Sequence, residues 1–387
     1  MTLRSLVPAL ALIAFGLPCG LAAETANPAR VPVSVAAEAP APVVELAILL
    51  DTSSSMDGLI DQARARLWTI VNDLAKTTRN GAIPDLRVAV YEYGNSGLSS
   101  ESNYIRQVIA LSDDLDAVSE ALFALNTNGG DEYCGAVIGR AMTDLKWTDG
   151  DHYRAIFIAG NEPFTQGPVP YAQTCKEAVS RGVVVNTIHC GNAEAGQSGM
   201  WADAARLADG TSLNIDQDRV EVAIAAPQDD RIRELNGELN KTYVAYGVAG
   251  EAKAERQMVQ DENAMASAPS SFADRAAAKS SKLYSNSDWD LVDAVVDGEV
   301  NLAEMEEAAL PQVMRGMSED ERKAYVAEQS KKRQNLQTEL TELVGARERF
   351  VAEKRAESGE QADDTFGAAA RSAIKVQLKE RGYTVGE

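Results

Sequence analysis

Oxygen-bearing side chains are concentrated in one short segment, Asp51-Thr52-Ser53-Ser54-Ser55. Asp51, Ser53 and Ser55 stand at alternate positions and bring one carboxylate and two hydroxyls to one turn. Mg²⁺ binds oxygen donors of this kind octahedrally and keeps several of its waters. The segment therefore predicts a site for Mg²⁺, or for Mn²⁺ or Ca²⁺ in its place. The alternative is a serine-rich turn that only caps the following helix.

The elements around this segment suit a binding site. Residues 44–50 are apolar except for Glu45, as expected of a strand that is buried on both faces. Residues 56–77 carry apolar side chains at helical spacing. In an open α/β sheet, ligands bind where strands end and helices begin. The segment at 51–55 lies at such a position.

Strand and helix patterns alternate from the first strand to about residue 218. This alternation predicts an α/β fold, a doubly wound and mostly parallel open sheet with helices on both faces and one early antiparallel strand. After Pro227 the strand signals end, and Glu, Ala, Lys, Gln and Ser dominate an α-helical C-terminal region. The expected strands are 44–50, 86–93, 105–111, 154–159, 183–189 and 211–215.

The Asp-x-Ser-x-Ser pattern after a hydrophobic strand resembles the metal-ion-dependent adhesion site of von Willebrand factor type A (vWA) domains. The resemblance extends from about Val43 to Asp218 and includes the segment 201–210 before a short strand. It implies a vWA-like, Rossmann-like fold and an exported bacterial vWA protein with a helical C-terminal region. It also implies a protein partner that presents an acidic side chain to the metal.

The resemblance adds two loops to the predicted site, and the chain departs from the family in both. Where the family has a threonine after a Gly-Gly pair, Gly129-Gly130 is followed by Asp131. Where the family has an aspartate after the fourth strand, Asn161 is the nearest oxygen donor, with Glu162 behind it. The predicted metal ligands are therefore Asp51, Ser53, Ser55, Asp131 and Asn161. An aspartate in the second loop would bind the metal more tightly and reduce its need for an acidic partner.

The N-terminus predicts export. Arg4, an apolar core at 6–17 and small residues at 20–23 form a signal peptide, residues 1–23, followed by an Ala/Pro linker at 24–42. No other apolar run is long enough to span a bilayer. The mature protein is thus expected in the periplasm, secreted or at the cell surface, with lipoprotein anchoring at Cys19 as the alternative.

Removal of the signal peptide leaves Cys134, Cys175 and Cys190, in a compartment that permits disulfides. Cys175 opens a helix and Cys190 closes the strand that follows it, so a bridge between these two is expected. Two unrelated buried thiols are the alternative.

The region after the vWA-like domain, 43–220, is expected to be helical. Residues 228–300 form a helical or linker segment, in which the polar stretch 258–282 is either a loose helix or a linker. Residues 301–387 form a helical tail that contains one long helix, opened by a capping box at Ser318. That helix packs on its own neighbours or forms a dimeric coiled coil, which would make the chain a homo-oligomer.

The net charge of −21 disfavours nucleic acid and favours divalent cations and basic partners. The sequence contains no nucleophile elbow, phosphate-binding loop or zinc-hydrolase motif, and its only histidines are His152 and His189. We therefore expect no enzyme but an exported protein-binding module, with its partner docked at the metal edge of the vWA domain. The alternatives are an envelope scaffold that acts through its acidic helical tail with a metal-free vWA fold and, less favoured, a metal-dependent hydrolase.

Overall fold

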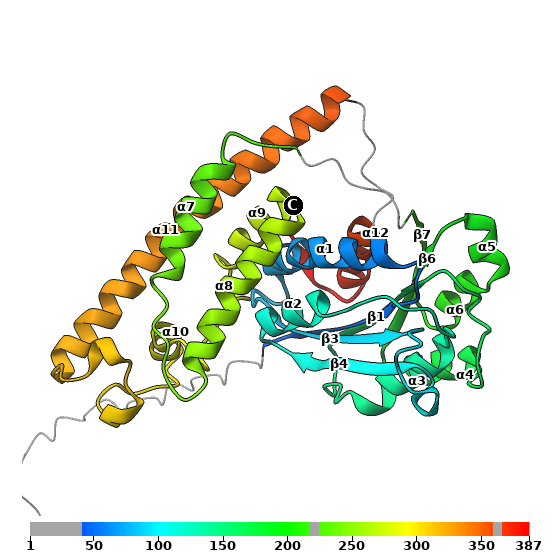
Figure 1. Cartoon of the computed structure of the whole chain (residues 1–387), viewed down its shortest axis with the longest axis horizontal. Coiled ribbons are helices and arrows are strands. Elements are labelled where there is room, and N and C mark those ends of the chain that lie inside the picture. The colour runs from blue at the N-terminus through cyan, green and yellow to red at the C-terminus, as the bar shows by residue number, and fades with distance from the viewer. Residues whose placement is uncertain (1–40, 217–223, 359–365, 387) are drawn as a thin grey trace, which may run out of the picture. The chain divides into compact units, whose positions relative to one another are not determined.

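A computed structural model describes residues 41–216, 224–358 and 366–386, all of which belong to one compact unit (Figure 1). The predicted signal peptide, the lipoprotein alternative at Cys19 and the linker up to residue 40 lie outside these residues. No helix in the described ranges is both long enough and apolar enough to cross a membrane.

The main sheet has six strands in the order β4-β3-β1-β5-β6-β7. All neighbouring strands are parallel except β3 and β4, which are antiparallel. This arrangement confirms the predicted fold class. Every residue of the central β1 is buried, because both neighbours and both helical layers cover it. The strands are β1 (Val43–Asp51), β3 (Asp85–Tyr93), β4 (Ile105–Ser112), β5 (Tyr153–Gly160), β6 (Val184–Cys190) and β7 (Ser212–Ile215).

Helices cover both faces of this sheet, and each face has its own apolar core. One core contains side chains of α1 (Asp57–Ala75), α2 (Leu115–Phe123) and α12 (Phe366–Glu380). The other contains side chains of α3 (Cys134–Asp144), α4 (Tyr171–Ser180) and α6 (Trp201–Leu207), and the short α5 (Ala193–Ser198) adjoins α6.

The end of the chain returns to the α/β core. Helix α12 lies beside α1 (Figure 1), and β8 (Thr384–Val385) pairs with β2 (Thr77–Thr78). The buried Gln377 accepts a hydrogen bond from Tyr153 Oη at 2.7 Å and donates one to Asn186 Oδ1 at 2.7 Å. The predicted domain limits 43–220, 228–300 and 301–387 stay predictions. Helix α12, however, belongs to the same apolar core as α1 and α2. Its core side chains are Phe366, Ala369, Ala370, Ala373, Ile374 and Leu378.

A helical segment fills the chain between β7 and α12. Its long helix packs against α7 and α9 through Leu336, Leu340 and Val344, which matches the first of the two alternatives for this helix. Arg333 and Arg347, which interrupt the heptad pattern, form ion pairs with residues of this same segment. A coiled coil between chains stays a prediction. The helices are α7 (Asp229–Asn240), α8 (Gly250–Ser267), α9 (Pro269–Ala278), α10 (Leu291–Val296) and α11 (Glu319–Ser358), with short 3-10 turns at Glu307–Ala309 and Gln312–Met314.

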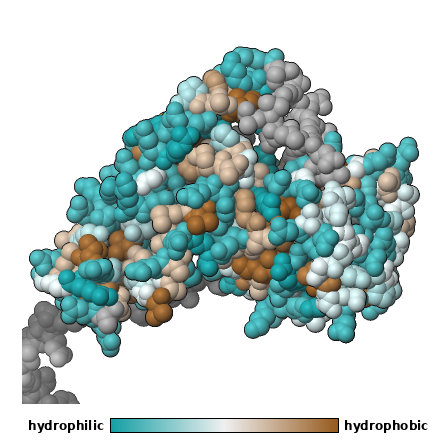
Figure 2. All heavy atoms as spheres, in the orientation of Figure 1, coloured by the Kyte–Doolittle hydropathy of each residue, from teal (hydrophilic) through white to brown (hydrophobic). Residues whose placement is uncertain are grey.

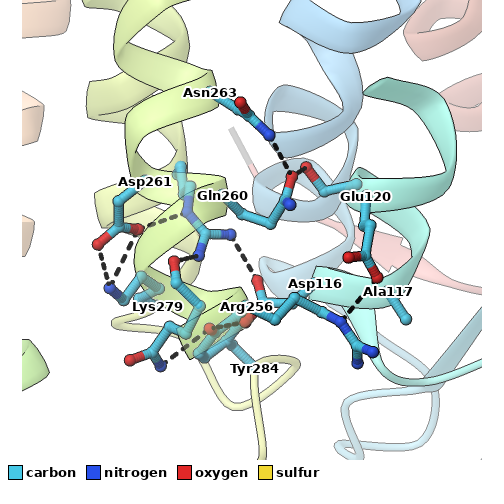
Figure 3. Close-up of polar contacts among 12 residues, drawn as sticks. Asp116, Ala117, Glu120, Arg256, Gln260, Asp261, Asn263, Lys279 and Tyr284 are labelled. Carbon is cyan, nitrogen blue, oxygen red and sulfur yellow. Dashed lines mark hydrogen bonds and ion pairs between the residues drawn. The ribbon is translucent and has the colours of Figure 1, made fainter. Parts of the chain in front are cut away.

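Buried charges connect the helical segment to the α/β layer (Figure 3). Arg275 of α9 is fully buried and pairs with Asp116 of α2 and with Asp261 of α8, both at 2.6 Å. Its guanidinium also lies 4.5 Å from the ring centroid of Trp68 in α1. Lys279 Nζ lies 3.0 Å from Asp261 Oδ2. Every charge in this cluster has a partner within it. The cluster therefore joins the two layers and has no unpaired charge with which to bind a ligand.

We predict that Arg275→Leu lowers the free energy of unfolding by about 3 to 5 kcal/mol, because it leaves Asp116 buried without its cation. Arg256→Gln is the matched control, since Arg256 pairs with Asp114 and Glu120 from a side chain that is 27% exposed. Loss of such a surface pair is expected to cost about 0 to 1 kcal/mol. Urea unfolding measures both, and equal losses would contradict the role given to Arg275.

A second pair of variants tests whether α12 belongs to the core. Ile374 is 3% exposed and Val376, on the same helix, is 53% exposed. Ile374→Ala should cost about 2 to 5 kcal/mol of stability, whereas Val376→Ala should stay within about 0.5 kcal/mol. If thermal and urea unfolding of the Ile374 variant matched the wild type, α12 would not be part of the folded core.

Candidate metal centre

Asp51 is the last residue of β1, at the edge where three parallel strands end together. It pairs in register with Tyr93 of β3, and its neighbour Leu50 pairs with Ala159 of β5. The loops that follow these strands therefore meet around the Asp51 side chain. Helix α1 begins at Asp57, so the turn from β1 to α1 also faces this edge.

The Asp51 carboxylate is fully buried, but only one of its oxygens is bonded to the protein. Oδ1 accepts a hydrogen bond from the backbone N–H of Ser53 at 2.7 Å. Oδ2 is buried and makes no hydrogen bond of normal distance and angle with the described residues, although the backbone N–H of Asn161 faces the carboxylate. Glycine at 160 is required here, since a Cβ would lie 3.0 Å from Oδ2 and 2.5 Å from Tyr93 Oη. The backbone thus closes around a carboxylate oxygen that lacks a partner.

The first and third loops meet through Ser55 and Asn161. Asn161 Nδ2 donates a hydrogen bond to Ser55 Oγ at 2.9 Å. Asn161 Oδ1 is buried and has no hydrogen-bond partner among the described residues. Ser53 is 6% exposed and adjoins Asp51. The structure therefore brings the loops that carry four of the five predicted ligands, Asp51, Ser53, Ser55 and Asn161, to one edge of the sheet, and Asn161 Oδ1 is a second buried oxygen there without a partner among the described residues.

The second loop presents a different carboxylate from the predicted one. Asp131 is exposed, and its Oδ2 accepts a hydrogen bond from Tyr133 Oη at 3.1 Å. Glu132 is 8% exposed and lies beside Asp51. A Cβ placed at Gly94 would lie 2.8 Å from Cγ of Glu132 and 2.9 Å from Oδ1 of Asp51. The sequence analysis chose the residue directly after the glycine pair; Glu132, one residue later, is the buried side chain that lies beside Asp51, and a ligand role for Asp131 stays a prediction.

Negative charge accumulates at this edge. Burial raises the pKa of Asp51 to about 6, against hydrogen bonds from Ser53 that lower it. Burial, followed by the charges of Asp51 and Glu162, raises the pKa of Glu132 to about 7. Among the ion pairs between described residues, none includes Asp51, Glu132 or Glu162. A cation that binds here would therefore relieve a real charge imbalance.

These residues fit a hard divalent cation. The site has two buried oxygens without donors, two serine hydroxyls and a neighbouring carboxylate, all of which are ligands for Mg²⁺, Mn²⁺ or Ca²⁺. The described ranges hold no group of three or more His, Cys, Asp and Glu side chains at metal-binding distance. A cation at this edge would thus depend on hydroxyl and amide oxygens in addition to carboxylates.

The predicted bridge between Cys175 and Cys190 is not formed, and both residues, like Cys134, are buried and form no disulfide. Cys175 belongs to the core beneath α3, α4 and α6. Cys190 belongs to the core on the other face, with α1 and α12. Because the two side chains belong to cores on opposite faces, the sheet separates the two sulfur atoms. The alternative of two unrelated buried thiols describes the structure.

No protein-family model and no curated protein matches the sequence. Among solved structures, the chain is similar to the VWA domain of SpRpn10, with 19% identity over 46% of this chain and 90% of that chain and a TM-score of 0.35. It is similar to BatB from Bacteroides thetaiotaomicron, with 16% identity over 45% and 90% of the two chains and a TM-score of 0.34. A third similarity is to proximal thread matrix protein 1 from the mussel byssus with a zinc-occupied MIDAS motif, with 15% identity and a TM-score of 0.36, over 46% of this chain and only 43% of that protein. The predicted open, mostly parallel α/β sheet is confirmed by its strand order and pairing, and the similarities concern the fold alone.

The raised pKa of Asp51 predicts an unusual pH dependence of the free energy of unfolding when a chelator has removed metal ions. The folded chain holds the Asp51 proton more tightly than the unfolded chain, because the pKa is about 6 instead of 3.8. Stability should therefore fall as pH rises from about 4 to about 7. Asp51→Asn removes this loss and keeps the acceptor for Ser53, so it should be more stable than the wild type by about 2 to 3 kcal/mol at pH 8 and nearly equal at pH 4.

The control is Asp113→Asn, at an exposed carboxyl after β4 that lies at the opposite edge of the sheet. Urea unfolding at both pH values gives the comparison. If Asp51→Asn were instead less stable than the wild type at pH 8, the charged Asp51 carboxylate would not destabilise the metal-free protein.

Proposed function

We propose that the chain is an exported, non-enzymatic protein-binding module whose partner docks at the Asp51 edge of the sheet around a bound divalent cation. The observation that carries this proposal is Oδ2 of Asp51, a buried carboxylate oxygen with no donor among the described residues. An oxygen in that state costs folding free energy unless a cation or a partner satisfies it. Its position at the carboxyl end of the central strand also suits a binding site.

Each residue of the site has a separate part in holding the cation. Asp51 would supply the charged ligand, and the Ser53 N–H keeps that carboxylate in its orientation. Ser53 and Ser55 would supply hydroxyls, and the hydrogen bond from Asn161 to Ser55 connects the first loop to the third. Mg²⁺ or Mn²⁺, when bound, provides open coordination positions at which an oxygen of a partner can bind.

The two histidines support binding over catalysis because each is engaged elsewhere. His189 Nδ1 lies 2.8 Å from Asn214 Oδ1, and the ring packs against Trp201. His152 Nδ1 accepts a hydrogen bond from the backbone N–H of Val43, at the start of β1. A metal-dependent hydrolase would need a free general base at the Asp51 edge. His152 lies at the other end of β1, and His189, in register with Gly160 near the carboxyl end of β6, is already bonded to Asn214.

Metal titration tests the cation. Calorimetry of the full chain with Mn²⁺, Mg²⁺ and Ca²⁺ should show binding that Asp51→Ala weakens by about 100-fold or more, since it removes the fully buried charged ligand. Asp113→Asn should leave the affinity within about twofold of the wild type. Equal binding by wild type and the Asp51 variant would place the metal elsewhere and defeat the proposal.

Partner capture tests the docking edge against the helical scaffold alternative. Deletion of the tail is unsuitable, because α12 contributes to the core of the α/β layer. Full-length wild type and Asp51→Ala should instead be cross-linked to envelope proteins with Mn²⁺ and again with EDTA. A partner that is lost with the variant and with EDTA supports docking at Asp51. A partner retained equally in all four samples would move the function to the helices.

A further inference from the structure

We propose that Glu132 supplies a second carboxylate to the cation at Asp51, so that the chain completes its own site and its partner approaches with a basic surface instead of an acidic side chain. This inference rests on the proposed function, since it needs a cation at Asp51. It departs from the expected acidic partner because Glu132, a carboxylate of the chain itself, lies beside Asp51.

The backbone forces Glu132 toward Asp51. Gly130 packs so closely on the loop after β3 that a Cβ there would lie 2.5 Å from the carbonyl oxygen of Gly94. Ser96 N–H donates to the carbonyl of Gly129 at 2.7 Å and holds the two loops together. Helix α3 begins two residues after Glu132, at Cys134. The second loop therefore has little freedom, which keeps the side chain of Glu132 beside Asp51.

The immediate neighbours of Glu132 are acidic or neutral. The side chain of Glu132 shares the space above Gly94 with Oδ1 of Asp51, and it faces the charge of Glu162. Asp131 turns outward to the hydroxyl of Tyr133 and does not compete for the same position. A divalent cation with Asp51 and Glu132 as ligands carries no net charge, so it has little attraction left for a third carboxylate.

The rim of the site also favours a basic partner. Asp57, the first residue of α1, and Asp131, in the second loop, are both exposed. Asp57 accepts a hydrogen bond at 2.5 Å from Thr127, in the loop that leads to Glu132. The whole chain has a net charge of −21. An acidic side chain that approaches this edge is repelled, whereas lysine and arginine side chains are attracted.

Glu132→Gln tests the ligand role, with Asp131→Asn as the matched control one residue away. Calorimetric titration with Mn²⁺ should show that Glu132→Gln weakens binding by about tenfold to 100-fold, because affinity follows the number of charged ligands. Asp131→Asn should change it less than about threefold. Melting in EDTA serves as the folding check, and there Glu132→Gln should be as stable as the wild type or more so.

Acetate then probes the open coordination position. Mn²⁺ bound to the wild type should give an electron paramagnetic resonance spectrum that acetate does not change. Mn²⁺ bound to Glu132→Gln, with one carboxylate fewer, should respond to acetate. Unchanged Mn²⁺ affinity in Glu132→Gln, or an equal acetate response in wild type and variant, would overturn the role of Glu132 while leaving the Asp51 site intact. Failure of the wild type to bind Mn²⁺ at all would defeat the proposed function itself.

Discussion

The central physical constraint in this structure is a buried carboxylate oxygen that has no hydrogen-bond donor among the described residues. Oδ2 of Asp51 ends the central strand, and burial of an unpaired carboxylate opposes folding by several kcal/mol. The chain tolerates this cost at one point, the edge where β1, β3 and β5 end. Glycine at 94 and 160 lets the adjacent backbone approach the carboxylate. A site that is costly to fold when empty is typical of one that is built for a ligand.

The rest of the molecule holds that edge in place. Helix α12 covers one face of the sheet, although residues 224–358 of the described chain come between it and β7. Arg275 then ties the intervening helices to α2, on the same side of the sheet. The helical segment is thus connected to the α/β layer by the backbone at both ends and by buried charge in the middle.

Period and composition were enough to predict the alternating strands and helices and the mostly parallel sheet, whereas the metal site at 51–55 stays a prediction. The contacts of α12 could not be predicted, because its apolar face does not identify a partner nearly 300 residues away in the sequence. The polar stretch 258–282 forms parts of α8 and α9 because Asp261 and Arg275 neutralise each other, which composition alone does not reveal. Asp131 and Glu132 differ by one position, and only the loop backbone decides which one turns inward. The cysteine pairing was wrong because spacing along the chain ignores which face of the sheet each sulfur occupies.

The most direct test of the account is a crystal structure of the full chain grown with Mn²⁺, with anomalous scattering used to locate the metal. We expect an anomalous peak at about 2.0 to 2.5 Å from Oδ2 of Asp51, with Asn161 and the serine hydroxyls close to it directly or through water. A crystal with ordered Mn²⁺ only at other acidic residues, and with Oδ2 of Asp51 still buried and free, would contradict the central claim.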